Sequence, residues 1–110
     1  MSNFAQISAE GVVTNVSVWG PITSPQDEQD AINFFTANVG PGPWIRTWYD
    51  AAQRAEPALY RYNFAGIGYE YRKDVLPIGA FVPPPPDSSW LLNTKTYRWQ
   101  KSLDDRHTLL

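Results

Sequence analysis

The sequence predicts an α+β fold: a small, twisted, mainly antiparallel β-sheet with one packed α-helix and an extended proline-rich C-terminal segment. Residues 12–19 alternate β-branched and polar side chains, which is typical of a strand. Residues 25–39 combine helix-capping signals with apolar side chains at helical spacing. Residues 83–86 are consecutive prolines, which neither a helix nor the interior of a sheet accepts. We expect one compact domain over residues 1–100, followed by a polar tail at 101–110.

Residues 4–19 predict a β-hairpin. Glu10 and Gly11 form the expected turn, because glycine adopts a positive φ without steric cost. Strict alternation places the side chains of the second arm on two faces. One face would hold Val12, Thr14, Val16 and Val18, and the other Val13, Asn15, Ser17 and Trp19.

Residues 25–39 predict the helix. Ser24 is a favourable N-cap, Pro25 suits the first helical position, and Asp27 completes a capping-box pattern. Gly40 is expected to end the helix in the left-handed conformation. The apolar stripe consists of Ala31, Ile32, Phe35 and Val39.

The middle of the chain predicts further strands. Residues 44–49 alternate Trp44, Arg46 and Trp48 with Ile45, Thr47 and Tyr49, and residues 51–58 form a linker, at most one helical turn, that Pro57 closes. Two more strands are expected over 60–71, the first with Tyr60, Tyr62 and Phe64 on one face and the second with Ile67, Tyr69 and Tyr71. A turn near 72–79 then returns the chain to Phe81 and Val82.

The C-terminal part predicts a stiff spacer followed by a second hairpin. Pro83–Pro86 should form a short polyproline II rod, which advances about 3.1 Å per residue. Two aromatic segments, 89–93 and 96–100, flank a predicted turn at 93–95. The spacer either positions these aromatic rings or lies as a strap over the domain's own aromatic side chains.

Composition argues against several classes of protein. The net charge is −2 and the nine Lys and Arg residues are scattered, so no basic field favours nucleic acid, and we interpret these residues as solvated surface charges. Cysteine is absent, which removes disulfides and thiolate nucleophiles. No apolar run reaches the length of a membrane helix, and the N-terminus does not resemble a signal peptide. We therefore expect neither nucleic acid nor a membrane as a partner.

The reactive groups do not form a recognisable active site. His107 lies beside Asp104 and Asp105 in the polar tail, whereas catalytic metals take ligands from a structured scaffold. The acidic residues 27–30 are explained by the helix N-terminus. The glycines at 40–42 and 66–68 lack the residues that complete a phosphate-binding loop or a dinucleotide site. We predict no enzymatic activity, no catalytic residue, no cofactor and no metal.

Two binding roles remain open at this point. The aromatic strands over 60–71 would stack nucleotide bases if a basic groove accompanied them, and the sequence lacks one. The proline run would suit an SH3-like or WW-like module, but no Arg or Lys flanks it at the expected spacing.

Residues 63–100 resemble a family of short bacteriophage proteins that is common in marine and cyanobacterial phages. The shared patterns are AGIGYxY at 65–71 and a PPxP segment at 83–86 followed by SWxLN and a second tryptophan. Upstream, the hairpin, the acidic helix and the segment WIRTWYD at 44–50 are also similar. The chain departs from the family at Arg72, where Asp is usual, at Pro85, where Lys is frequent, and in a longer insertion before Ala80.

The resemblance implies a component of the phage particle, assembled in the host cytoplasm and located in the virion. We expect a capsid decoration or cement protein that binds the major capsid lattice. The alternatives are a tail, tail-fibre or baseplate component, and a phage-encoded binding module inside the infected cell. Expected partners are other virion proteins, either major capsid or tail proteins, and further copies of the chain itself. The predicted partner-binding residues are Tyr69, Tyr71, Phe81, Pro83, Pro84, Pro86, Trp90, Leu92 and Trp99.

Overall fold

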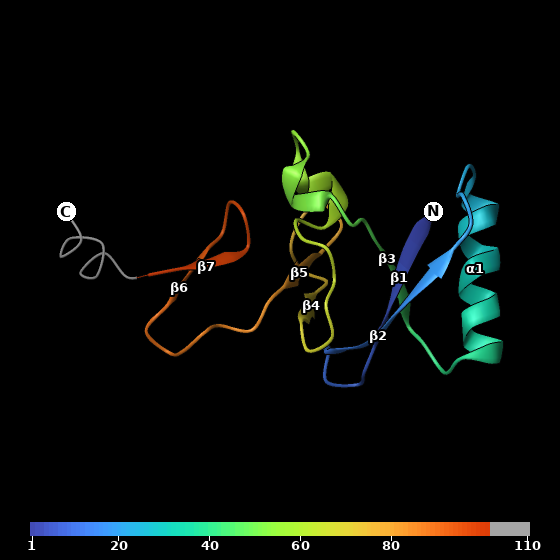
Figure 1. Cartoon of the computed structure of the whole chain (residues 1–110), viewed down its shortest axis with the longest axis horizontal. Helices are drawn as coiled ribbons and strands as arrows, with labels where there is room; N and C mark the ends of the chain where they lie inside the picture. The colour runs from blue at the N-terminus through green and yellow to red at the C-terminus, as the bar shows by residue number, and fades with distance from the viewer. Residues whose placement is uncertain (102–110) are drawn as a thin grey trace.

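A computed structural model of the chain confirms the α+β fold and describes residues 1–101. The predicted tail beyond Lys101, with His107 and its neighbouring aspartates, lies outside the described residues. In chain order, the elements are β1 (Ser2–Ile7), β2 (Val13–Trp19), α1 (Pro25–Asn38), β3 (Trp44–Thr47), η1 (Ala51–Gln53), η2 (Pro57–Tyr60), β4 (Glu70–Arg72), β5 (Ala80–Val82), β6 (Leu91–Asn93) and β7 (Arg98–Gln100) (Figure 1).

The largest sheet has the order β2-β1-β3, and both neighbours run antiparallel to β1. Helix α1 covers one face of this sheet (Figure 1). The buried cluster between them, here the helix-side cluster, consists of Phe4, Ala31, Phe35 and Trp44. The Phe35 ring stacks on Trp44 with 4.8 Å between centroids, so these aromatic side chains fill the layer between helix and sheet.

The opposite face of the sheet packs against the β4–β5 hairpin. The buried residues there, the hairpin-side cluster, are Ala5, Ile7, Val13, Ala65 and Phe81. An isolated bridge between Val12 and Glu70 links the two sheets. The sheet is therefore buried on both faces, which explains why β1 alternates buried side chains between two different layers.

A bulge changes the predicted faces of β2. Gln6 pairs with Asn15 and Ile7 with Val13, so Thr14 is the extra residue. Val13 consequently packs in the hairpin-side cluster with Val16, whereas Trp19 packs in the helix-side cluster. The prediction that Val13 shares a face with Trp19 is wrong, because one inserted residue inverts the alternation of side chains.

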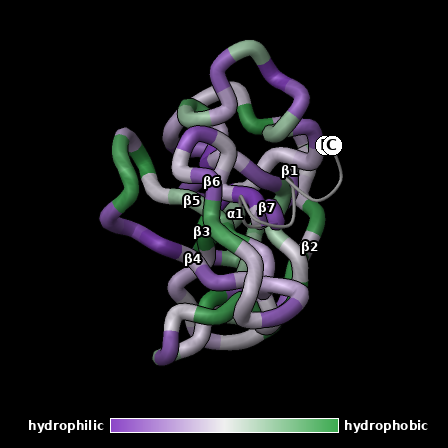
Figure 2. Tube along the Cα trace, turned by 90° about the vertical axis from the view of Figure 1, so that its left-hand side faces the viewer, coloured by the Kyte–Doolittle hydropathy of each residue, from purple (hydrophilic) through white to green (hydrophobic). Residues whose placement is uncertain are grey.

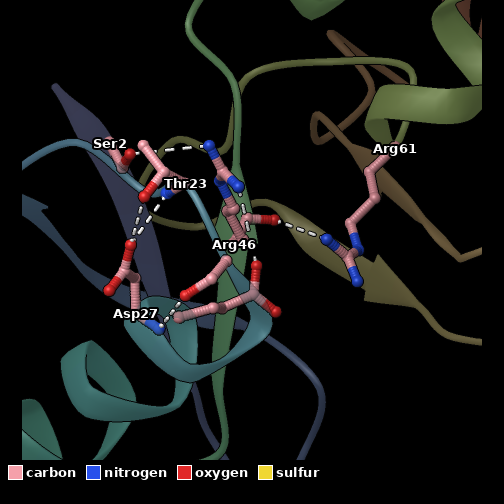
Figure 3. Close-up of polar contacts among 7 residues, drawn as sticks. Ser2, Thr23, Asp27, Arg46 and Arg61 are labelled. Atoms are coloured by element: carbon pink, nitrogen blue, oxygen red, sulfur yellow. Dashed lines mark hydrogen bonds and ion pairs between the residues drawn. The ribbon is translucent and has the colours of Figure 1, made fainter.

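The start of α1 agrees with the prediction in part. The Ser24 Oγ accepts a hydrogen bond from the Asp27 N–H at 3.1 Å, as an N-cap does. The Asp27 carboxylate accepts from the N–H and the hydroxyl of Thr23, at 2.9 and 2.7 Å (Figure 3). These two bonds, the backbone one foremost, lower the pKa of Asp27 below its usual value. The Asp27 carboxylate of the capping box therefore binds the N–H of Thr23, one residue before the predicted partner, Ser24.

The end of α1 corrects two predictions. Gly40 does not have a positive φ; the glycines that do are Gly11, Gly68 and Gly79. Its importance is steric, because a Cβ at Gly40 would lie 2.8 Å from the Gln6 Nε2. Val39 is 48% exposed and does not belong to the buried stripe; it is the C-cap that follows the last helical residue, Asn38.

We expect Ser24→Ala to lower the free energy of unfolding by about 1 kcal/mol, because the Asp27 N–H loses its acceptor at the helix start. Chemical denaturation followed by circular dichroism measures this change. Ser88→Ala, in the exposed segment after the prolines, is the matched control. Equal stability of the two variants would contradict the capping role.

The strand predicted over Tyr60–Phe64 is wrong. Pro57–Tyr60 forms a 3₁₀ turn, and Arg61 and Tyr62 have φ of +60° and +69°. Proline favours the start of such a turn, and two consecutive left-handed residues are incompatible with an extended strand. The predicted linker at 51–58 contains the single turn η1, and Pro57 begins η2 and does not close the linker.

The C-terminal hairpin is confirmed, with β6 antiparallel to β7 and Tyr97 at φ +52° in the turn. Residues 83–86, here the proline spacer, connect it to β5 and contain no helix or strand. We call residues 87–101 the arm and residues 1–82 the body. The arm lies at the opposite end of the molecule from α1 (Figure 1). Within residues 1–101, no hydrophobic core residue lies after Val82.

Candidate partner-binding groove

A cavity of about 620 Å³ lies between the body and the arm, and we call it the arm groove. The body contributes aromatic and small side chains, and the arm and spacer contribute prolines, Arg98 and Trp99. The lining residues are Tyr49, Ala52, Gln53, Asn63, Phe64, Ala65, Gly66, Tyr69, Pro83, Pro84, Pro86, Arg98 and Trp99. Aromatic and proline surfaces with a few polar groups are typical of peptide-binding grooves.

The groove brings together Tyr69, Pro83, Pro84, Pro86 and Trp99, all of which the sequence predicts as partner contacts. The Trp99 indole N–H donates to the Pro83 carbonyl at 2.5 Å, which orients the ring along the spacer. Both Tyr69 and Trp99 are half-buried. Gly66 makes room for the Tyr69 ring, since a Cβ there would lie 2.8 Å from the ring.

Phe81 is not available to a partner. It is fully buried in the hairpin-side cluster, and its ring meets the Tyr71 ring at a tilt of 40°, with 5.0 Å between ring centroids. The prediction of a contact role for Phe81 is therefore wrong: alternation along β5 points this side chain into the core. We leave Phe81 out of the proposed contact surface.

Tyr71, Trp90 and Leu92 lie elsewhere. The Tyr71 hydroxyl donates to the Ile78 carbonyl at 3.2 Å, and its ring lines a second cavity of about 1170 Å³. Trp90 and Leu92 are half-buried in the arm and do not line the arm groove. The structure therefore divides the predicted contact residues among a groove, a second cavity and the free part of the arm.

The second cavity borders the loop at 73–79. Figure 2 shows this loop, between β4 and β5, projecting from the body with hydrophobic residues at its outer end. Leu76 is 80% exposed there. This loop adds an apolar surface that the sequence patterns did not indicate.

Asn63 is the functional residue that sequence reasoning missed. It is 5% exposed, and its amide group donates to the carbonyls of Phe81, Thr96 and Tyr97 at 2.9, 3.3 and 3.0 Å. Its Oδ1 accepts from the Arg98 Nε at 3.1 Å. Asn63 thus joins the body to the arm at one buried point. A polar side chain within an otherwise aromatic segment was the sequence feature that could have indicated this buried contact.

Arginines and aromatic rings form a second missed cluster beside β3. The Arg46 guanidinium lies over the Trp48 ring at 4.8 Å and faces the Glu28 carboxylate at 3.7 Å. It also lies 3.5 Å from the Ser2 hydroxyl (Figure 3). The Arg61 Nη1 donates to the Arg46 carbonyl at 2.8 Å (Figure 3). Arg46 and Arg61 are therefore structural residues rather than solvated surface charges.

The same cluster continues through Arg54. Its guanidinium lies over Tyr60 at 4.0 Å and donates to the Asp50 carboxylate at 2.9 Å, which raises the pKa of Arg54. The Tyr60 ring in turn meets the edge of Trp48 at 5.3 Å. These contacts anchor η1 and η2 against β3 and so hold one wall of the arm groove.

Residues 1–101 contain no group of three or more His, Cys, Asp or Glu side chains that could hold a metal. No helix in that part of the chain is long and apolar enough to cross a membrane. The groove itself is lined by aromatic, proline and amide groups, so its chemistry suits binding. No family model, curated protein or solved structure matches this chain.

Proposed function

We propose that the chain is a structural protein of a bacteriophage particle, a capsid decoration or cement protein that binds the major capsid lattice. The observation that carries the proposal is the arm, which displays tryptophan and leucine side chains outside the core. Trp90 is half-buried and Leu91 is 52% exposed, at the end of the molecule away from α1 (Figure 1). The family resemblance over residues 63–100 supports the same role.

The proline spacer supports a docking role on energetic grounds. Binding a partner costs conformational entropy for each flexible residue that becomes ordered. Prolines lose little entropy because their φ is already restricted. At the end of the spacer, the Asp87 carboxylate accepts from the Ser89 N–H at 2.8 Å and from the Ser89 hydroxyl. The arm can therefore present its rings to a partner at small entropic cost.

Tryptophan and tyrosine dominate the binding energy of many protein interfaces. The arm groove and the arm supply Tyr69, Trp90 and Trp99 within one end of the molecule. A lattice of repeated capsid subunits would offer the same complementary surface many times. We infer that each copy contacts the capsid through this end and leaves α1 exposed.

Copy number tests the location of the protein in the particle. Gel densitometry of purified virions should give hundreds of copies per particle if the chain covers the capsid lattice. A few or tens of copies would instead identify a tail, fibre or baseplate component. Complete absence from purified particles would overturn a structural role and favour a binding module inside the infected cell.

We expect Trp90→Ala to weaken binding to capsids strongly while it leaves the melting temperature nearly unchanged, because Trp90 is not in the core. Co-sedimentation with capsids lacking the protein measures binding, and calorimetry measures the melting temperature. Phe34→Ala is the control, since it removes a 47% exposed ring from α1 at the other end of the molecule. Unchanged capsid binding by Trp90→Ala would contradict an anchor role for this ring.

A further inference from the structure

The arm groove contains a single charged side chain. Of its lining residues, Arg98 alone is charged, whereas the others are aromatic rings, prolines, small residues and two amides. The carboxylates next to lining residues in sequence are already bound, Asp50 by the Arg54 side chain and Asp87 by Ser89. Arg98 therefore gives the groove a positive charge that no carboxylate pairs with in the part of the chain that the structure describes.

The contacts of Arg98 differ from those of the other described arginines. Three of these form ion pairs with carboxylates, and Arg61 donates to two backbone carbonyls. Arg98 is exposed, and its Nε donates to the Asn63 Oδ1 at 3.1 Å. Both of its Nη groups lack an acceptor among residues 1–101. Because Asn63 is held by three carbonyls, the guanidinium is anchored at its Nε edge and offers its two Nη groups side by side.

The walls of the groove suit an extended chain with apolar side chains. Pro84 and Pro86 supply apolar surface and no backbone N–H. The body supplies the half-buried Tyr69 ring and Phe64, whose ring is 36% exposed. The N–H and carbonyl of Phe64 and the N–H of Gly66 have no partner among the described residues. Unpaired main-chain groups of this kind can bind the backbone of an extended peptide.

We propose that the arm groove binds an extended peptide segment that carries one aspartate or glutamate among apolar residues, with its carboxylate on the two Nη groups of Arg98. The planar fork of arginine matches a carboxylate in a bidentate pair, and such a pair is stronger than a neutral hydrogen bond. The apolar neighbours of the acidic residue pack on Phe64, Tyr69 and the prolines. The assignment of this segment to the major capsid protein rests on the proposed function, whereas the charge of the groove does not.

Selection from a random library tests the chemistry of the ligand. Displayed peptides with random sequences are selected on the immobilised natural chain. We expect the selected peptides to share an aspartate or glutamate at one position, flanked by apolar residues. Selected peptides with no preference for an acidic residue, or no selection of any peptide, would overturn the proposal.

A double-mutant cycle tests the contact with Arg98. The strongest selected peptide is compared with a twin in which its acidic residue is replaced by the corresponding amide, and fluorescence anisotropy measures binding. On the natural chain the twin should bind about tenfold more weakly, because a charge-assisted pair is lost. On Arg98→Gln the two peptides should bind equally, since the carboxylate has no partner left. A twin that remains tenfold weaker on Arg98→Gln would overturn the pairing.

Two control variants protect this comparison from effects on folding. Arg72→Gln makes the same chemical change outside the groove and should preserve the tenfold difference between the peptides. Phe64→Ala should weaken both peptides equally, because it removes apolar wall and no charge. Any loosening of the arm by Arg98→Gln also acts on both peptides equally and cancels in the cycle.

The source of the segment is tested with the same assay. Overlapping peptides that cover the major capsid protein of the same phage are added to the natural chain. Binding of a capsid peptide that matches the selected pattern supports the site and the proposed function together. If selected peptides bind through Arg98 and no capsid peptide does, the site stands and the capsid is overturned as the partner. If a peptide with the sequence of residues 102–110 binds through Arg98, the chain's own tail replaces a partner segment as the occupant and overturns the proposal.

Discussion

Phe81→Ala is expected to lower the free energy of unfolding by about 3–5 kcal/mol, the largest effect of any substitution considered in this protein. The Phe81 side chain is fully buried among Ala5, Ile7 and Val13. Its removal would leave a cavity against the main sheet and would remove the aromatic contact that Phe81 makes with Tyr71. Urea denaturation followed by tryptophan fluorescence measures the change.

The matched control for Phe81 is Phe64→Ala, the same chemical change at a ring that is 36% exposed and lines the arm groove. We expect this variant to lose much less stability, because solvent already covers part of the ring. The pair separates the core from the lining of the arm groove. If Phe81→Ala were as stable as Phe64→Ala, the burial of Phe81 would be refuted.

Asn63→Ala should release the arm while the body remains folded. The substitution removes the donor for three carbonyls and the acceptor for Arg98. Leaving a buried polar group without a partner costs roughly 1–3 kcal/mol, and the Phe81 carbonyl is one such group. The weakly packed arm has little other attachment, so its local stability should fall most.

Hydrogen exchange resolves the two parts of this prediction. In Asn63→Ala, amides of β6 and β7 should exchange much faster, whereas those of β1 and β3 should remain protected. Asn63→Asp is a near-isosteric comparison that keeps an acceptor for Arg98 but presents a carboxylate to three carbonyls, so we expect it to release the arm as well. Asn33→Ala, the same chemical change on the exposed face of α1, is the control. Unchanged exchange of the arm in both Asn63 variants would refute its role as the attachment point.

The sequence alone determined the local elements of this protein. The β1–β2 hairpin with its turn at Gly11, the capped helix from Pro25, the strand at Trp44 and the C-terminal hairpin all follow from patterns within a few residues. Such patterns are readable because neighbouring residues decide them: a cap lies three residues from its donor, and alternation has a period of two. The bulge at Thr14 escaped this reasoning because one extra residue has no local signature.

The arm groove was predictable only in its parts. Aromatic and proline residues led to the prediction of a contact surface, and five of them line one groove: Tyr69, Pro83, Pro84, Pro86 and Trp99. The sequence did not indicate which aromatic side chains would be buried in the core. The strand β5 places Phe81 in the hairpin-side cluster, whereas Trp99 lies beyond the proline spacer.

The tertiary structure alone decided where the distant residues meet. Asn63 contacts residues 18 to 35 positions further along the chain, and Arg61 reaches the carbonyl of Arg46 from outside the sheet. These contacts depend on the left-handed backbone at residues 61–62 and on the path of the chain after the spacer. The periodicity of side chains predicts neither of these features. Local sequence specifies each element because its interactions are short-range. The site arises where several elements converge, and that convergence is a property of the whole packed chain.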